Sequence, residues 1–176
     1  MHIEHTTEHN RVTYKGEALK DGMRELLSQF TFTHWVTLNF HQVLTQAAAK
    51  RRLKRWTMNV QDRLFRNASA AAFEENPFFY FAFPEDTKKL QPHFHLPLRI
   101  PTAYFDYFER VAERMWLKIV PSGTADVQRI VQSDLDHLKV RIYATKQFNR
   151  ACSHNEFFTS TMLVDPACQP ADMEFH

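Results

Sequence analysis

The 176-residue sequence predicts a single α+β domain, and three observations predict it. Short segments in which apolar and polar residues alternate, as in strands, are interleaved with longer segments of helical periodicity. Residues 76–83 and 91–100 are two strand-like segments separated by a polar turn, which predicts a β-hairpin. Sixteen Phe but only three Gly suit an aromatic core, and they argue against folds built on glycine turns or Gly-rich phosphate loops.

The first elements follow from these patterns. Residues 1–15 are polar and predict an arm, and residues 16–30 predict a short helix. The segment WVTLNF (35–40) alternates between an apolar and a more polar set, so it predicts a strand. A long helix is expected from about 42 to 67, with the basic run KRRLKR (50–55) in its middle. This run holds five of the 22 basic residues.

The later elements continue the alternation of strands and helices. Thr102 and Ser133 are expected as helix N-caps, because a hydroxyl side chain can accept from the first free backbone N–H groups. The expected elements are a strand at 76–83, a turn at 84–92, a helix at 102–119, a strand at 125–131 and a helix at 133–148. The domain organisation predicted is an arm and short helix at 1–30, the main domain at 31–150 and an irregular C-terminal tail at 151–176.

The segment QPHFHLPLRI (91–100) carries two histidines where its strand pattern is cleanest. Because side chains on a strand alternate between faces, one face is wholly apolar and consists of Phe94, Leu96, Leu98 and Ile100. The other face carries His93 and His95, about 7 Å apart along the strand. The two imidazoles either act as a pair or are two ordinary polar groups on a half-exposed strand.

The helix at 133–148 presents a second ordered group of polar residues. Leu135, Leu138 and Ile142 follow apolar helical spacing and predict the packed face. A polar stripe runs beside them, formed by Lys139, Tyr143, Lys146 and Gln147. A phenol is a weak nucleophile at neutral pH unless a cation or base helps it. A metal held by the histidine strand would supply that help, although a tyrosine on an amphipathic helix more often only packs its ring.

Three short motifs together resemble the HUH single-strand DNA endonucleases of the rolling-circle replication-initiator (Rep) type. TLN within WVTLNF is similar to the first motif of that family, HFH (93–95) to its metal-binding motif and YATK (143–146) to its YxxK nucleophile motif. The motifs occur in the family's order over residues 32–148. The resemblance implies a central antiparallel sheet of about five strands with flanking helices, similar to an RRM fold. The histidines would lie on an inner strand, and the tyrosine helix would cover the same face.

The resemblance also implies a metal site and a covalent mechanism. His93 and His95 would bind a divalent metal together with an upstream acid, for which Glu85 is the best placed, ahead of Asp86, Glu74 and Glu75. Imidazole and carboxylate ligands suit Mn²⁺ or Mg²⁺, and the same set would also accept Zn²⁺. Tyr143 would attack the scissile phosphate to leave a 5′-phosphotyrosine. Lys146 would stabilise charge on the phosphate or phenolate, or orient a metal-bound water.

The partner expected on this hypothesis is single-stranded DNA at an origin or hairpin. Phosphate contacts are predicted for the basic run, and further DNA contacts for side chains near the site; these residues are Lys50, Arg51, Arg52, Lys54, Arg55, Asn39, Lys139 and Gln147. A basic run on a helix can equally be a solvated face. The expected role is to initiate rolling-circle replication of a plasmid or phage-like element, with unwinding left to a host helicase.

Other function classes fit the sequence less well or stay open. A single-tyrosine transposase of the same family is the nearest rival, although YxxK favours a Rep, and a catalytically inactive DNA-binding module would keep only the fold. A cupin-like metal enzyme also uses H-x-H, but three Gly suit that barrel badly. A two-histidine phosphoesterase needs two H-x-[ST] motifs, whereas the one H-x-[ST] here is residues 5–7.

The sequence also bears on the cellular compartment. No secretory signal peptide and no apolar run of about 18 residues is evident, which predicts a soluble, cytoplasmic protein. Cys152 and Cys168 do not have the spacing of a zinc site, and reduced thiols are expected in that compartment.

Overall fold

A computed structural model describes residues 5–66, 78–86, 91–131, 133–146 and 157–164. The contacts divide the chain into two compact units, one made of residues 32–130 and 157–176 and the other of residues 1–31 and 131–156. The first unit contains the sheet and is called the sheet unit below. The described part of the second is helical, and this unit is called the helical unit.

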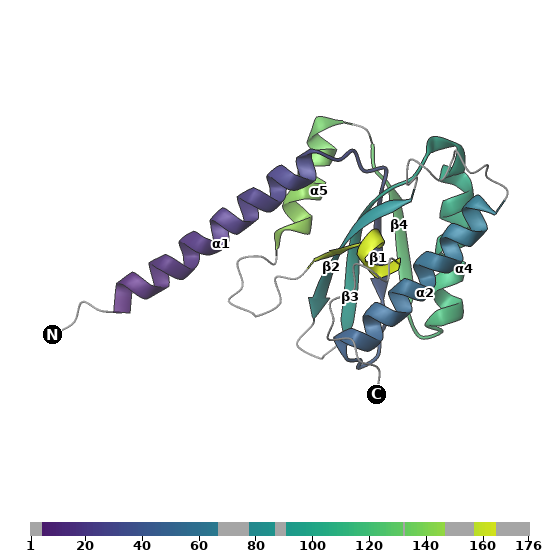
Figure 1. Cartoon of the computed structure of the whole chain (residues 1–176), viewed down its shortest axis with the longest axis horizontal. Helices are drawn as coiled ribbons and strands as arrows, with labels where there is room; N and C mark the ends of the chain where they lie inside the picture. Colours follow the sequence, from purple (N-terminus) through teal and green to yellow (C-terminus); the bar gives the residue numbers. More distant parts are fainter. Residues whose placement is uncertain (1–4, 67–77, 87–90, 132, 147–156, 165–176) are drawn as a thin grey trace. The chain divides into compact units, whose positions relative to one another are not determined.

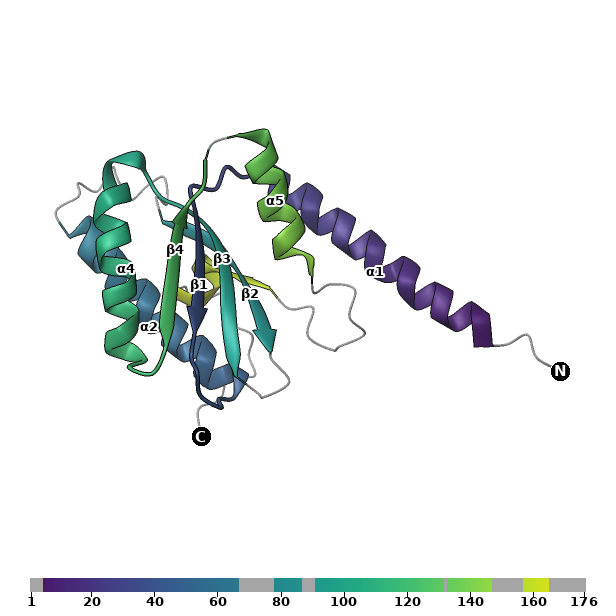
Figure 2. The ribbon, with the colours of Figure 1, turned by 180° about the vertical axis from the view of Figure 1, so that it is seen from behind.

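The sheet unit has five antiparallel strands in the order β4-β1-β3-β2-β5, which confirms the predicted fold class (Figure 1). The strands are β1 (His34–Asn39), β2 (Phe79–Asp86), β3 (Pro92–Arg99), β4 (Thr124–Arg129) and β5 (Phe158–Thr159). The histidine strand β3 is in the middle, between β1 and β2. Figure 2 shows β4, β1, β3 and β2 side by side, with α2 (Gln46–Phe65) behind them.

The core lies between one face of the sheet and the helices α2 and α4 (Phe105–Ile119). The predicted apolar face of β3 is confirmed, since Phe94, Leu96 and Leu98 are fully buried and Ile100 is nearly so. Fully burying one such side chain stabilises a fold by about 1.5–3 kcal/mol. The two helices are joined by a hydrogen bond of 3.0 Å from Trp56 Nε1 to the carbonyl oxygen of Ala112. The opposite face of the sheet is therefore left for the histidines.

Capping explains where several helices begin. The helix α2 begins at Gln46 rather than near 42, because Thr45 is its N-cap and accepts a hydrogen bond from Ala48 N. The predicted cap Ser133 is confirmed and starts α5 (Asp134–Ala144). Thr102 is not an N-cap but opens a short 3₁₀ turn, η1 (Thr102–Tyr104), directly before α4.

Two terminal predictions are wrong. Residues 5–15 of the expected arm belong to one continuous helix, α1 (His5–Ser28). The prediction missed it because a helix without a clear apolar stripe leaves no periodic signal in the sequence. The expected irregular tail contains β5 and the helix α6 (Ser160–Val164), both too short for periodicity to reveal. No described helix combines the length and the apolar character that crossing a membrane would require.

The helical unit packs differently from the prediction. Leu135, Leu138 and Ile142 were expected to face a core but are 62%, 44% and 47% exposed. Val140 and Ala144 are buried instead. In the same unit Arg24 Nε donates a 3.2 Å hydrogen bond to Thr145 Oγ1, which links α1 to the C-terminal end of α5.

Candidate metal centre

Strand register brings one acid beside the histidine pair. In the β2–β3 ladder, Glu85 is the partner of His93, and Phe83 is the partner of His95. The sequence predicted that the first hairpin strand ends at residue 83 and that Glu85 lies in the turn. The strand instead continues to Asp86, so Glu85 is fixed by ladder pairing on the same face as the histidines.

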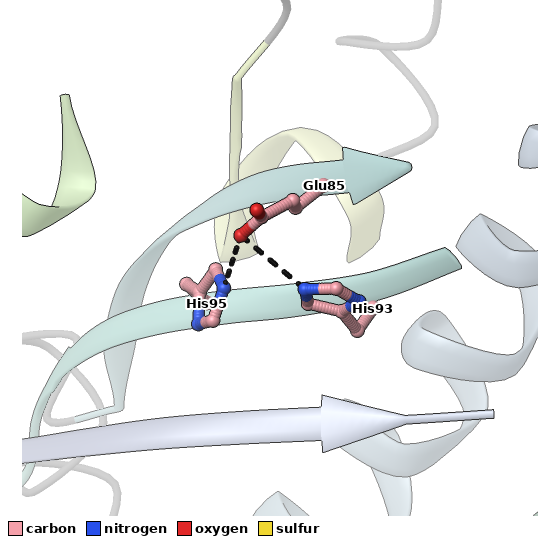
Figure 3. A group of neighbouring side chains, drawn as sticks. All are labelled: Glu85, His93 and His95. Atoms are coloured by element: carbon pink, nitrogen blue, oxygen red, sulfur yellow. Dashed lines mark hydrogen bonds and ion pairs between the residues drawn. The ribbon is translucent and has the colours of Figure 1, made fainter. Parts of the chain in front are cut away.

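The three side chains converge on one small volume (Figure 3). Glu85 Oε2 lies 2.8 Å from His95 Nε2 and 3.3 Å from His93 Nε2. One possible ligand atom from each of the three residues lies within 4.8 Å of the other two. Glu85, His93 and His95 can therefore hold a metal ion, and this group of three is called the metal centre below.

The donor set and its spacing fit a divalent cation. In an octahedral shell with metal–ligand distances of about 2.1 Å, neighbouring ligand atoms lie about 3 Å apart. The two distances from Glu85 Oε2 are close to that separation. Only 17% of the His93 side chain, 8% of the His95 side chain and 18% of the Glu85 side chain are exposed. The three side chains are therefore mostly buried, but each keeps some contact with solvent.

The last residue of β1 lies beside the strand that carries the two histidines. Asn39 is the ladder partner of His93, and its Nδ2 donates a 3.1 Å hydrogen bond to Thr124 Oγ1. His41 Nε2 lies at the same distance, 3.1 Å, from Thr124 Oγ1. The backbone of His41 has a φ of 51°, which few residues with a side chain adopt. The DNA contact expected of Asn39 stays a prediction; its hydrogen bond to Thr124 was not predicted, because it depends on the pairing of β1 with β4.

The basic run lies on the other side of the sheet. It belongs to α2, which packs on the apolar face, and Lys50 Nζ lies 5.0 Å from the centre of the Phe158 ring. Arg52 has a buried guanidinium nitrogen, whereas Arg51 and Arg55 are exposed. The five basic side chains therefore do not converge on the metal centre. Their contact with DNA stays a prediction and would involve phosphates away from the metal.

The predicted nucleophile lies on α5 in the helical unit. Tyr143 is 47% exposed, and Lys146 Nζ lies 3.8 Å from the centre of its ring. The two side chains are therefore in contact as expected, but α5 ends at Ala144 rather than at residue 148, so Lys146 lies beyond the helix and not on its face. Lys139, expected to contact DNA, forms a 2.9 Å ion pair with Asp136. The approach of Tyr143 to the metal centre stays a prediction, and Gln147, like the alternative acids Glu74 and Glu75, lies outside the described residues.

A third histidine on these strands has a different role. His34 is fully buried on the apolar face, where its Nε2 lies 3.1 Å from Glu109 Oε1. Burial lowers the pKa of His34 below its usual value, although Glu109 partly opposes the shift. Arg129 donates to Glu109 at 2.7 Å and holds the pKa of that carboxyl low. This network joins β1, α4 and β4. His34 therefore has a structural role and lies on the face of the sheet opposite His93 and His95.

Comparisons with known proteins leave the family open. No family model and no curated protein matches the chain. A solved structure, that of the hypothetical protein ORF119 from Sulfolobus islandicus rod-shaped virus 1, is similar over 72% of this chain and 90% of that chain. The identity is 15% and the TM-score 0.41, so this likeness carries no argument about function.

Proposed function

We propose that the protein is a metal-dependent enzyme that nicks and rejoins single-stranded DNA through a covalent 5′-phosphotyrosine, and that it initiates rolling-circle replication. The observation that carries the proposal is the convergence of Glu85, His93 and His95 on the face of the five-stranded antiparallel sheet opposite the one packed against α2 and α4. A histidine pair without function on a half-exposed strand would not require a carboxylate within 3.3 Å of both imidazoles.

The metal centre has a defined task in this reaction. A bound Mn²⁺ or Mg²⁺ supplies Lewis-acid stabilisation of negative charge on a phosphate oxygen. Glu85, His93 and His95 would hold it with one carboxylate oxygen and two imidazole nitrogens. Because the ladder between β2 and β3 fixes all three residues, the ligand set is preorganised and little conformational freedom is lost when the ion binds.

The covalent step belongs to Tyr143 and Lys146. The Tyr143 oxygen forms a bond to phosphorus as the bond from phosphorus to the 3′ oxygen breaks, and that oxygen leaves as a hydroxyl after taking up a proton. The Lys146 ammonium, which lies beside the Tyr143 ring, stabilises the negative charge that develops on the phosphate. The phosphotyrosine retains a phosphodiester linkage, so attack by a free 3′-hydroxyl reverses the step and joins two ends.

The experiment is to incubate the protein with single-stranded, origin-like hairpin oligonucleotides and Mn²⁺, and then to look for a covalent protein–DNA band. The proposal predicts a band that requires the metal and disappears in Tyr143→Phe, which keeps the ring and removes only the attacking oxygen. Tyr107→Phe is the matched control, because Tyr107 is an exposed tyrosine on α4. An adduct that survives in Tyr143→Phe would refute the assignment of the nucleophile.

A transposase of the same family would give the same adduct but would differ in its products. Joining of the nicked strand to an unrelated target strand would favour transposition, whereas re-joining at the origin would favour a Rep. DNA binding without any adduct over a panel of hairpins would leave a non-catalytic DNA-binding module instead.

A further inference from the structure

The strand β1 carries the TLN motif, which the proposed reaction does not use. This strand pairs with β3 in antiparallel register, and Thr37 is the ladder partner of His95. Trp35 and Thr37 lie on the face that carries the metal centre, since Val36 and Leu38 between and beyond them are fully buried on the other face. The outer side chains of β1 therefore border His95 on the side away from Glu85.

Both ring nitrogens of His95 have partners. Its Nε2 lies 2.8 Å from Glu85 Oε2, and its Nδ1 lies 3.2 Å from Thr37 Oγ1. A neutral imidazole carries one N–H, so one nitrogen donates and the other accepts. If Nε2 is to bind a metal, its lone pair must be free and the proton must be on Nδ1.

A threonine hydroxyl suits this position because it can both donate and accept. Without a metal, Nε2–H can donate to Glu85 while the Thr37 hydroxyl donates to Nδ1. With a metal on Nε2, the same hydroxyl turns and accepts from Nδ1–H. His95 is only 6% exposed, so an Nδ1–H without an acceptor would lose its hydrogen bond to water without replacement, which is unfavourable.

Trp35 restrains the same ring by packing. Its ring system is stacked on the His95 imidazole, with centroids 5.6 Å apart and planes at 25°. The imidazole of His93 stands almost perpendicular to that of His95, at 86° with centroids 5.1 Å apart. The stack limits rotation of His95 about its side-chain bonds, so its Nε2 stays directed toward Glu85 and His93.

We infer that Thr37 is a positioning residue for the metal centre: it accepts from Nδ1–H of His95, selects the tautomer whose Nε2 binds the metal, and works with Trp35 to fix the ring. This gives the TLN motif a physical role. The inference rests on the proposed metal centre but not on Tyr143 or on DNA.

The test measures the metal affinity of the wild type and of three variants of the full chain by isothermal titration calorimetry, with Mn²⁺ or Zn²⁺ alone as the probe. Thr37→Val keeps the branched shape and removes the hydroxyl, so we expect affinity to fall by about 10–100-fold, as for other groups that orient a metal-binding histidine. Thr37→Ser restores the hydroxyl and should restore the affinity. Thr124→Val, the same change on the neighbouring strand β4, should bind as the wild type does.

A second readout separates positioning from a general loss of structure. In ¹⁵N spectra of the Zn²⁺-loaded protein, His95 should be the Nδ1–H tautomer, with a ring N–H that exchanges slowly with water in the wild type and in Thr37→Ser. In Thr37→Val this N–H should exchange fast, while the thermal transition shows that the fold persists.

The outcomes distinguish this inference from the metal centre itself. If the wild type binds neither ion, the metal centre is refuted and the inference falls with it. If the wild type binds and Thr37→Val binds equally well with an unchanged N–H, only the role of Thr37 is refuted.

Discussion

Gly123→Ala tests how the end of β1 beside the metal centre is held. Gly123 lies in the connection between α4 and β4, where the carbonyl oxygen of Asn39 accepts a 3.0 Å hydrogen bond from Trp116 Nε1. A Cβ at position 123 would collide with that carbonyl oxygen, and it would lie 2.8 Å from Trp116 Nε1 and 2.9 Å from Val120 Cγ1. Two of these three neighbours are the partners of the hydrogen bond, so the added methyl group would separate them.

The magnitude follows from these contacts. Overpacking a close-fitted site costs about 1–3 kcal/mol, because backbone and ring atoms must move. Losing the hydrogen bond between Trp116 and Asn39 adds about 1 kcal/mol. We therefore expect Gly123→Ala to lower the free energy of unfolding by about 2–4 kcal/mol, a large share of the stability of a typical domain.

Urea unfolding followed by circular dichroism and tryptophan fluorescence measures this change. Gly22→Ala is the matched control, because a Cβ at Gly22 would meet no atom within 4 Å. Since Gly22 is inside the helix α1, alanine there should raise helix stability by about 0.5–1 kcal/mol. Equal unfolding midpoints for Gly123→Ala and the wild type would refute the packing of this connection against Asn39.

Two further predictions concern charge. Because burial lowers the pKa of His34, the unfolded chain binds a proton on this residue more readily than the folded chain does. The free energy of unfolding should therefore decrease as the pH drops below the unfolded pKa of 6.5. In urea unfolding between about pH 7 and about pH 5, the free energy of unfolding of His34→Gln should decrease less steeply than that of the wild type, and equal slopes would contradict this. If the basic run binds DNA phosphates, changing Arg51, Lys54 and Arg55 to Gln should reduce the slope of log K for DNA binding against log salt concentration by about 2. Cleavage at saturating DNA should stay nearly normal. An unchanged slope would mean that the basic run is only a solvated helix face.

The histidine strand was predictable because both of its faces leave a signal. Alternation alone separates His93 and His95 from the buried Phe94, Leu96 and Leu98, and this division is confirmed. Glu85 was the preferred third ligand from its position, and the structure brings it to both imidazoles. Its geometry could not be predicted, because the continuation of β2 to Asp86 depends on pairing with β3 rather than on local sequence.

The contacts around the metal centre could not be predicted from the sequence for a related reason. The contact between Thr37 and His95 joins positions 58 residues apart, and it depends on the register of β1 against β3. Periodicity also failed for α5, where the apolar residues Leu135 and Leu138 are exposed and the smaller Val140 and Ala144 are buried. Hydrophobic spacing shows which helix face can be buried, whereas tertiary packing decides which face is buried.

Mn²⁺ binding tests most directly whether Glu85, His93 and His95 hold a metal ion. Binding is measured as the decrease in the paramagnetic resonance signal of free Mn²⁺. The wild-type chain should bind Mn²⁺ at one site, and this binding should be lost when His93 and His95 are both changed to Ala. It should be retained in His41→Ala, because His41 follows the same end of β1 but is outside the metal centre. The double variant should keep its fold, because neither side chain belongs to the apolar core. A wild-type chain that binds no Mn²⁺, or a double variant that binds it equally well, would contradict the account.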